Sequence, residues 1–245
     1  MPRFFIENVS GDFITISGDE ANHIIKSLRM KVGENVTVCG GQGIDFICEI
    51  AEISDGCVQL KVTDKVPTDS EPSVKITLYQ GYPKGDKLEL IIEKSIELGV
   101  TEIVPVLMRR SVSRPDAKSA AKKHERHQKQ ALSAAKQCGR GIIPQVSEMI
   151  NFNQMVTRLA EHQAVIFFYE CGGESLSSVI GKIAADNLSD IAIVIGPEGG
   201  FDLSEAEALK NSGAVTATLG KRILRTETAP IAAIAAIMYA TGIMD

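Results

Sequence analysis

The chain has 245 residues, 44% of them hydrophobic and 23% charged, which is enough for two domains with buried cores and excludes an intrinsically disordered protein. The five cysteines form no C-x-x-C pair, and the N-terminus lacks the pattern of a signal peptide. We therefore expect a cytoplasmic protein with free thiols. The net charge of −5 argues mildly against a nucleic-acid partner, but the segment 109–140 contains ten Lys or Arg and only two acidic residues. Such a run is typical either of a solvated helix face or of a phosphate-contacting surface.

Residues 1–70 predict a small β-barrel with one short helix around 19–30. The β-rich runs are separated by Gly, Asp and Asn and cover residues 4–9, 12–17, 35–40, 44–53 and 57–63. In the segment 66–73, Pro67 and Pro72 flank acidic and hydroxyl residues without an apolar period. This segment predicts a linker, so we expect one domain at 1–70 and a second at 74–245.

Beyond the linker, strands and helices alternate, which predicts an α/β domain with a mainly parallel sheet. Predicted strands cover 74–81, 102–108, 163–170 and 191–196, and predicted helices cover 86–99, 119–139, 152–161, 175–186, 202–212 and 229–242. Asp202 and Glu205 suit the N-cap and third position of their helix. The apolar segment 229–244 is too short and too alanine-rich to cross a bilayer of about 30 Å, so we expect a packed C-terminal helix and no membrane partner.

Two loops near the C-terminus are candidates for a ligand site. The strand "IVIG" ends in "PEGGF" at 197–201, and "LGKRILRTETAP" follows at 219–230. Ligands of open α/β sheets sit at the carboxyl ends of strands, and glycines let the backbone approach a ligand closely. The loop matches neither a dinucleotide fingerprint nor a Walker loop, so the residues alone leave ligand binding and a plain tight turn both open.

The two loop sequences together resemble the paired C-terminal signatures of the ribosomal small-subunit (16S) RNA uridine-N3 methyltransferases of the SPOUT superfamily. The likeness also covers the runs at 1–5, 23–34, 84–106 and 134–146. One departure is that His127 stands where we expect a tryptophan in "HERHQKQ". This substitution puts one packing or RNA contact in doubt.

The resemblance implies a trefoil-knotted α/β methyltransferase domain, a PUA-like N-terminal barrel that binds RNA, and a homodimer. It also implies that S-adenosylmethionine binds bent among three loops, without a metal. The donor-binding residues would be Phe168, Tyr169, Ile195, Gly196, Glu198, Gly199, Gly200, Leu219, Gly220, Ile223 and Leu224. Without the resemblance, the aliphatic residues of this set are typical of ordinary core.

The implied substrate is 16S ribosomal RNA, and the resemblance favours the assembled small subunit. Candidate RNA contacts are Arg3, Lys26, Arg29, Lys31, Lys84, Arg109, Arg110, Gln137 and Arg140. Two other classes stay open: an RNA-binding or assembly protein without catalysis, and an α/β enzyme that uses the glycine loop for a small phosphorylated metabolite. Binding of the sulfonium donor, and consumption of its methyl group, would separate all three.

For catalysis, the base must lose its N3 proton, and the charge then spreads onto the two flanking carbonyl oxygens. Arg225 is our hypothesised electrostatic catalyst, because a planar guanidinium suits a uracil edge; Arg222 is the weaker candidate. Glu227 is the alternative proton acceptor. Thr226 is expected to position the base or to cap the last helix, and Thr228 to cap that helix.

Overall fold

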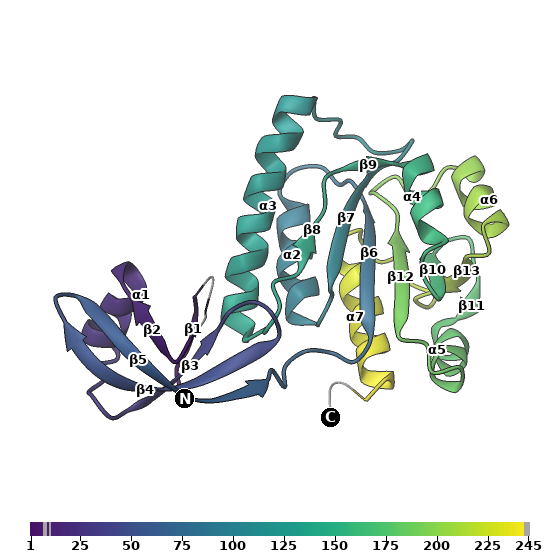
Figure 1. Cartoon of the computed structure of the whole chain (residues 1–245). Coiled ribbons are helices and arrows are strands. Elements are labelled where there is room, and N and C mark those ends of the chain that lie inside the picture. The colour runs from purple at the N-terminus through teal and green to yellow at the C-terminus, as the bar shows by residue number, and fades with distance from the viewer. Residues whose placement is uncertain (7–8, 10, 243–245) are drawn as a thin grey trace. The chain divides into compact units, whose positions relative to one another are not determined.

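The computed structural model describes residues 1–6, 9 and 11–242, and these form two compact units (Figure 1). The first unit comprises Met1–Glu71 and Ala135–Ile143, and the second comprises Pro72–Ala134 and Pro144–Asp245. The sequence analysis assigned residues 135–143 to the second domain, whereas they are compact with the first. The long helix α3 (Ala117–Cys138) therefore begins in one unit and ends in the other.

The first unit contains a five-stranded sheet in the order β1–β3–β4–β5–β2. The strands are β1 (Arg3–Phe5), β2 (Phe13–Ile16), β3 (Asn35–Cys39), β4 (Ile44–Ser54) and β5 (Cys57–Pro67). The predicted runs and the short helix are confirmed, the latter as α1 (Gly18–Asn22) and a π-helical segment, His23–Ser27; Glu7 and Asn8 of the first run lie outside the described residues. Alternating apolar side chains such as Ile14, Ile16 and Leu60 build this unit's core.

The second unit contains a parallel sheet in the order β11–β13–β10–β12–β6–β7–β8, with β9 beside β7. Its strands are β6 (Lys75–Gly81), β7 (Glu102–Leu107), β8 (Gln145–Val146), β9 (Ile150–Asn151), β10 (Ala164–Phe168), β11 (Glu174–Ser175), β12 (Asp190–Ile195) and β13 (Val215–Thr218). The predicted parallel α/β fold is confirmed, because every described pairing in this sheet is parallel.

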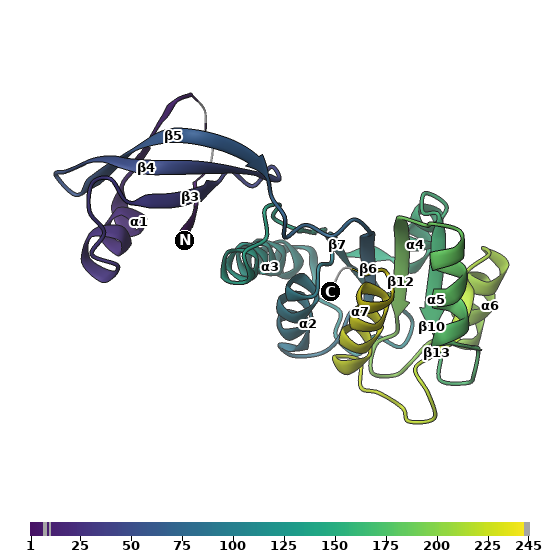
Figure 2. The ribbon, with the colours of Figure 1, turned by 90° about the horizontal axis from the view of Figure 1, so that it is seen from below.

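Helices cover both faces of this sheet (Figure 2). On one face, α4 (Phe152–Leu159) and α6 (Leu203–Asn211) bury Met155, Leu159 and Leu209 against Phe167. On the other, α7 (Thr228–Ala240) packs against β12 and contacts both α2 (Lys87–Glu97) and α5 (Leu176–Ala185). Within the described part of the chain, no helix is long and apolar enough to span a membrane.

The helix ends test the capping predictions. Asp202 accepts from Ser204 N, and Glu205 reaches back to Asp202 N, so the predicted capping box of α6 is confirmed. The prediction that Thr228 caps the last helix is wrong, because the N-cap position of α7 is Glu227 and Thr228 is the first helical residue. The last predicted residues of the apolar segment, Ile243 and Met244, lie outside the described range.

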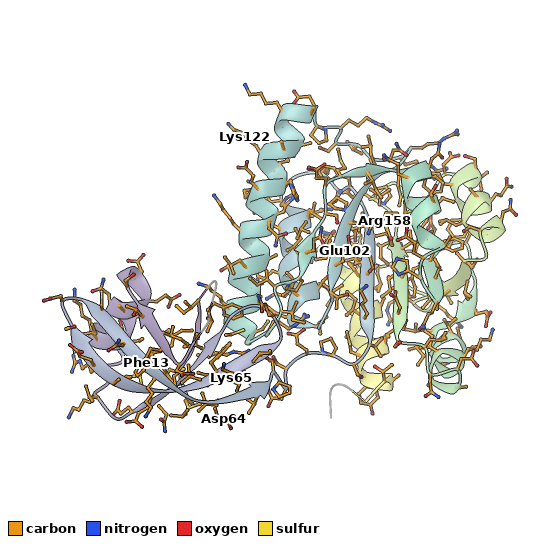
Figure 3. The ribbon with its side chains drawn as sticks, viewed as in Figure 1. Phe13, Asp64, Lys65, Glu102, Lys122 and Arg158 are labelled. Atoms are coloured by element: carbon orange, nitrogen blue, oxygen red, sulfur yellow. The ribbon has the colours of Figure 1, made fainter. Side chains whose placement is uncertain are left out.

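Polar contacts fix α4 against the amino ends of the strands. Arg158 contacts both carboxylate oxygens of Glu102, at 2.9 and 3.0 Å, where β7 begins (Figure 3). His162 links Asp190 Oδ1 at 2.6 Å to the Tyr79 hydroxyl at 3.0 Å, and burial raises the pKa of Tyr79 to about 12. These contacts hold together the edge of the sheet at which the strands begin. The candidate site lies at the opposite edge, at the carboxyl ends of the strands.

Candidate active site

A cavity of about 580 Å³ opens where three loops follow the carboxyl ends of β10, β12 and β13. All eleven residues predicted to bind the methyl donor line this cavity: Phe168, Tyr169, Ile195, Gly196, Glu198, Gly199, Gly200, Leu219, Gly220, Ile223 and Leu224. Arg222, Arg225 and Thr226 line it as well. The parallel register of β10 with both β12 and β13 explains the convergence, because it brings three strand ends to one edge of the sheet.

Glycine is required in the loop after β12 for two different reasons. Gly200 has φ +66°, a conformation that residues with a side chain rarely adopt, and a Cβ there would also make the exposed Glu170 carboxylate on the neighbouring loop move aside. At Gly199, a Cβ would lie 2.9 Å from Arg110 Cβ and 3.1 Å from its carbonyl oxygen. A side chain at either position would therefore displace a neighbouring residue, and at Gly200 it would also strain the backbone.

A buried hydrogen-bond chain holds the third loop against the rest of the sheet. Thr226, 7% exposed, donates from Oγ1 to the Gly196 carbonyl at 2.8 Å and accepts from Gln80 Nε2 at 3.0 Å. Gln80 is fully buried at the end of β6 and also donates to the Gly81 carbonyl at 3.1 Å. The Thr226 hydroxyl thus connects the loops after β12 and β13.

Lys87 links two of the loops electrostatically, and the sequence analysis missed it. Its Nζ lies 3.1 Å from Glu198 Oε1 and 3.2 Å from Glu227 Oε2. The contact with Glu198, followed by that with Glu227, raises the pKa of Lys87 against the opposing effect of desolvation. Although burial acts to raise it, the pKa of Glu198 is lowered by its own backbone N–H, by Lys87 and by the Lys84 N–H.

The two arginine candidates of the third loop are exposed. The Arg225 side chain is 83% exposed, and its Nη1 lies 4.0 Å from Glu227 Oε1. Arg222 is exposed too, and Ile223 lines the cavity while keeping 84% of its surface in solvent. Ile195 is buried, and Leu219 and Leu224 are half-buried, so the tightly packed apolar wall consists of these three rather than of Ile223. Glu170, which the sequence analysis also missed, lines the same cavity.

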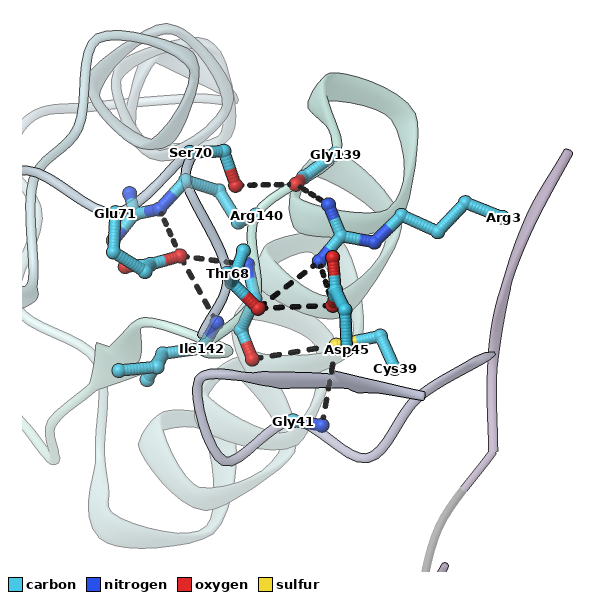
Figure 4. Close-up of polar contacts among 11 residues, drawn as sticks. Arg3, Cys39, Gly41, Asp45, Thr68, Ser70, Glu71, Gly139, Arg140 and Ile142 are labelled. Atoms are coloured by element: carbon cyan, nitrogen blue, oxygen red, sulfur yellow. Dashed lines mark hydrogen bonds and ion pairs between the residues drawn. The ribbon is translucent and has the colours of Figure 1, made fainter. Parts of the chain in front are cut away.

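Two of the predicted RNA contacts, Arg3 and Arg140, make polar contacts within the first unit (Figure 4). Arg140 is 3% exposed and pairs with Glu71, whose Oε2 lies 2.8 Å from Arg140 Nη2. Arg3 donates to the Gly139 carbonyl and to Asp45 Oδ1, the latter at 2.7 Å. Both guanidiniums are thus used within the first unit: Arg140 is too buried to reach RNA in this structure, whereas the Arg3 side chain keeps 20% of its surface exposed and its RNA contact stays a prediction.

The remaining RNA candidates are exposed side chains: Lys26, Arg29, Lys31, Lys84, Arg109, Arg110 and Gln137. Arg29 has φ +53°, an uncommon conformation for a residue with a side chain. Arg109 and Arg110 lie 3.5 and 3.7 Å from the carboxylate of Asp202. Much of the basic run therefore faces solvent, as Lys122 of α3 does in Figure 3.

His127 fills a packing position. It is 5% exposed and lines a small pocket with Tyr82, Pro105 and Met149. Burial, followed by the nearby charges of Arg126 and Lys123, lowers its pKa to about 4. His127 is therefore neutral at physiological pH. Because its side chain is buried, it packs inside the fold and does not reach RNA in this structure.

Comparisons with known proteins identify the family of this chain. Residues 70–238 match the family described as an RNA methyltransferase domain, and residues 16–63 match an RNA methyltransferase PUA domain. The ribosomal RNA small subunit methyltransferase E of Bacillus subtilis is 35% identical over 100% of this chain and 98% of its own length. The chain belongs to the ribosomal RNA small subunit methyltransferase E family.

Solved structures of methyltransferase E proteins and their relatives extend the likeness to the whole fold. The enzyme of Neisseria gonorrhoeae, bound to S-adenosyl methionine, is 33% identical, covers 98% of this chain and 97% of that chain, and has a TM-score of 0.82. A putative methyltransferase of Legionella pneumophila, in complex with the same cofactor, is 29% identical, covers 97% of each chain, and has a TM-score of 0.80.

Proposed function

We propose that this protein transfers a methyl group from S-adenosylmethionine to N3 of one uridine in 16S ribosomal RNA, on the assembled small subunit. Family membership supports methylation of small-subunit RNA. The observation that carries the proposal is the convergence of three loops on one cavity, with an exposed arginine, Arg225, in its lining.

The cavity suits the donor in size and in chemistry. Its volume of about 580 Å³ lies within the usual range for small-molecule sites. Ile195, Leu219 and Leu224 offer apolar contact to the adenine, and backbone groups at Gly196, Gly199 and Gly220 can bond its edge and the ribose. When bound there, S-adenosylmethionine supplies an electrophilic methyl group.

The residues of the third loop would act on the base. Arg225 extends into solvent, so an incoming uracil can meet its guanidinium without breaking an internal hydrogen bond. Once RNA excludes water, that positive charge stabilises the negative charge on the uracil carbonyl oxygens. Thr226 would act indirectly, because its hydroxyl is already used in holding the loop. Glu227 remains the alternative proton acceptor.

The other parts of the proposal concern architecture and partners. Residues 1–70 would form a PUA-like barrel that binds RNA through Lys26, Arg29 and Lys31, and residues 74–245 a trefoil-knotted SPOUT methyltransferase domain. The enzyme would act in the cytoplasm as a homodimer and without a metal. Exposed Leu90 and Tyr239, on the contacting helices α2 and α7, are compatible with a second subunit.

Single-turnover methylation at saturating donor and RNA tests the catalytic assignment. We expect Arg225→Ala to lower the rate by roughly 10²-fold or more, as for loss of a transition-state contact, and Arg222→Ala to lower it less. Glu227→Gln should have a comparable effect if that carboxylate accepts the proton. A near-wild-type rate for Arg225→Ala would refute its role.

Calorimetry with S-adenosylmethionine and with its demethylated product tests donor binding separately. Both should bind the wild-type protein. An RNA-binding protein without catalysis would bind neither, and an enzyme of phosphorylated metabolites would bind a different ligand.

A further inference from the structure

Lys87 is the first residue of α2 and lines the cavity together with Arg225 of the loop after β13. Its ammonium carries three donors and lies 3.1 Å from Glu198 Oε1 and 3.2 Å from Glu227 Oε2 in two ion pairs. The Lys87 side chain is 30% exposed. The side chain is therefore only partly enclosed by the two carboxylates and can also contact a ligand in the cavity.

Lys87 and Arg225 approach different oxygens of the Glu227 carboxylate. Its Oε2 is buried, and the Lys87 ammonium contacts it at 3.2 Å as an ion pair rather than as a well-aligned hydrogen bond. Its Oε1 lies 4.0 Å from Arg225 Nη1. Both cations therefore lie beside one carboxylate, and both line the same cavity.

The chemistry of uridine N3 gives a use to two cations. The N3 proton lies in the ring plane, in the direction from which a methyl carbon must also approach the nitrogen. A proton acceptor and the methyl group cannot occupy that position together, so ionisation comes first: the N3–H bond breaks, its electron pair stays on the ring and the proton passes to water. That pair then forms the N3–C bond while the donor's C–S bond breaks, with its electrons left on sulfur. Between the two steps, the charge rests largely on the carbonyl oxygens O2 and O4.

We propose that Lys87 is a second substrate-contacting cation, which together with Arg225 binds the two carbonyl oxygens of the ionised uracil, one at each. This inference rests on the proposed uridine-N3 methylation. It also gives a basis for selecting uridine, because cytosine carries an amino group in place of O4. In either orientation of the base, one cation would then face that amino group, a donor against a donor. Glu227 orients the two cations and Glu198 holds Lys87 in place.

The test compares Lys87→Met and Lys87→Gln with the charge-retaining Lys87→Arg in full-length protein. Lys94→Met is the matched control, because Lys94 lies on the same helix and, among the described residues, forms ion pairs with Glu93 and Glu97 only. Single-turnover methylation of small subunits is measured from neutral to alkaline pH at saturating donor. Calorimetry with S-adenosylmethionine is run on each variant.

We expect the two neutral variants to lose about tenfold to a hundredfold in rate at neutral pH. Without one stabilising cation, the bound uracil should ionise at higher pH, so the deficit should shrink as the pH rises. The loss in rate should exceed any loss in donor affinity, Lys87→Arg should recover most of the rate, and Lys94→Met should behave as wild type.

A deficit of equal size at every pH would overturn the inference, because it would indicate a purely structural lysine. Wild-type rates in both neutral variants, or a loss of donor binding in them, would overturn it too. The proposed function fails differently: wild-type enzyme would then place its methyl group on an atom other than uridine N3, whatever residue stands at position 87.

Discussion

Replacing Thr226 with valine should separate the two loops that this hydroxyl joins. Thr226 is 7% exposed and Gln80 is fully buried, so neither of their polar groups can turn to water instead. The change removes the hydrogen bonds to the Gly196 carbonyl and from Gln80 Nε2, at 2.8 and 3.0 Å, while Gln80 keeps its bond to Gly81. At about 1 kcal/mol for each bond, plus a partial cost for the buried groups left unpaired, we expect a loss of about 2–3 kcal/mol.

A loss of that size lowers Tm by roughly 5–10 °C for a unit of this length. Thermal unfolding followed by circular dichroism measures it, and calorimetry with S-adenosylmethionine should show affinity reduced about tenfold, because a loosened loop must be ordered on binding. Thr228→Val is the control, since Thr228 is exposed and is the first residue of α7. If both variants unfolded at the same temperature, the hydroxyl would not be holding the site together.

Three further changes probe other parts of the molecule. Gly200→Val should abolish donor binding while Gly181→Val, at an open helical position, leaves it intact; equal affinities would remove this loop from the donor site. Charge reversal at Lys26 and Arg29 should weaken binding to small subunits and leave donor affinity unchanged. The slope of log K against log salt concentration should become shallower by at least about 0.7 for each lost contact, and an unaltered slope would contradict the assignment. The unfolded chain protonates His127 near pH 6.5, but the folded protein does so only near pH 4. Stability should therefore fall as the pH drops from 6.5 to 4, and His127→Leu should lose about 2–3 kcal/mol of that dependence, as urea unfolding at several pH values would show.

Local sequence signals predicted most of the fold correctly, because they depend on neighbouring residues. The apolar run 191–196 became β12, and Asp202 with Glu205 marked the start of α6. The two-residue strands β8, β9 and β11 were missed, since so short a pairing carries no period. Their partners lie elsewhere in the chain, and only the folded sheet brings them together.

Side-chain roles that depend on distant partners were harder to predict. A run of positive charge gave no sign that Arg140 would be buried against Glu71, 69 residues earlier. Lys87 was missed for the same reason, because Glu198 and Glu227 approach it only when the ends of three separate segments converge. The signal that could have found it is its place at a helix start directly after a strand of the sheet.

Mapping the methylated nucleotide tests the central claim most directly. Small subunits that lack the modification would be incubated with the wild-type protein and S-adenosylmethionine, and their RNA digested and analysed by mass spectrometry together with reverse transcription. We predict 3-methyluridine at a single position of 16S RNA, approaching one methyl group per subunit, with the donor consumed in equal amount. Methylation of a different atom or of another base, or binding of the donor without any transfer, would contradict it.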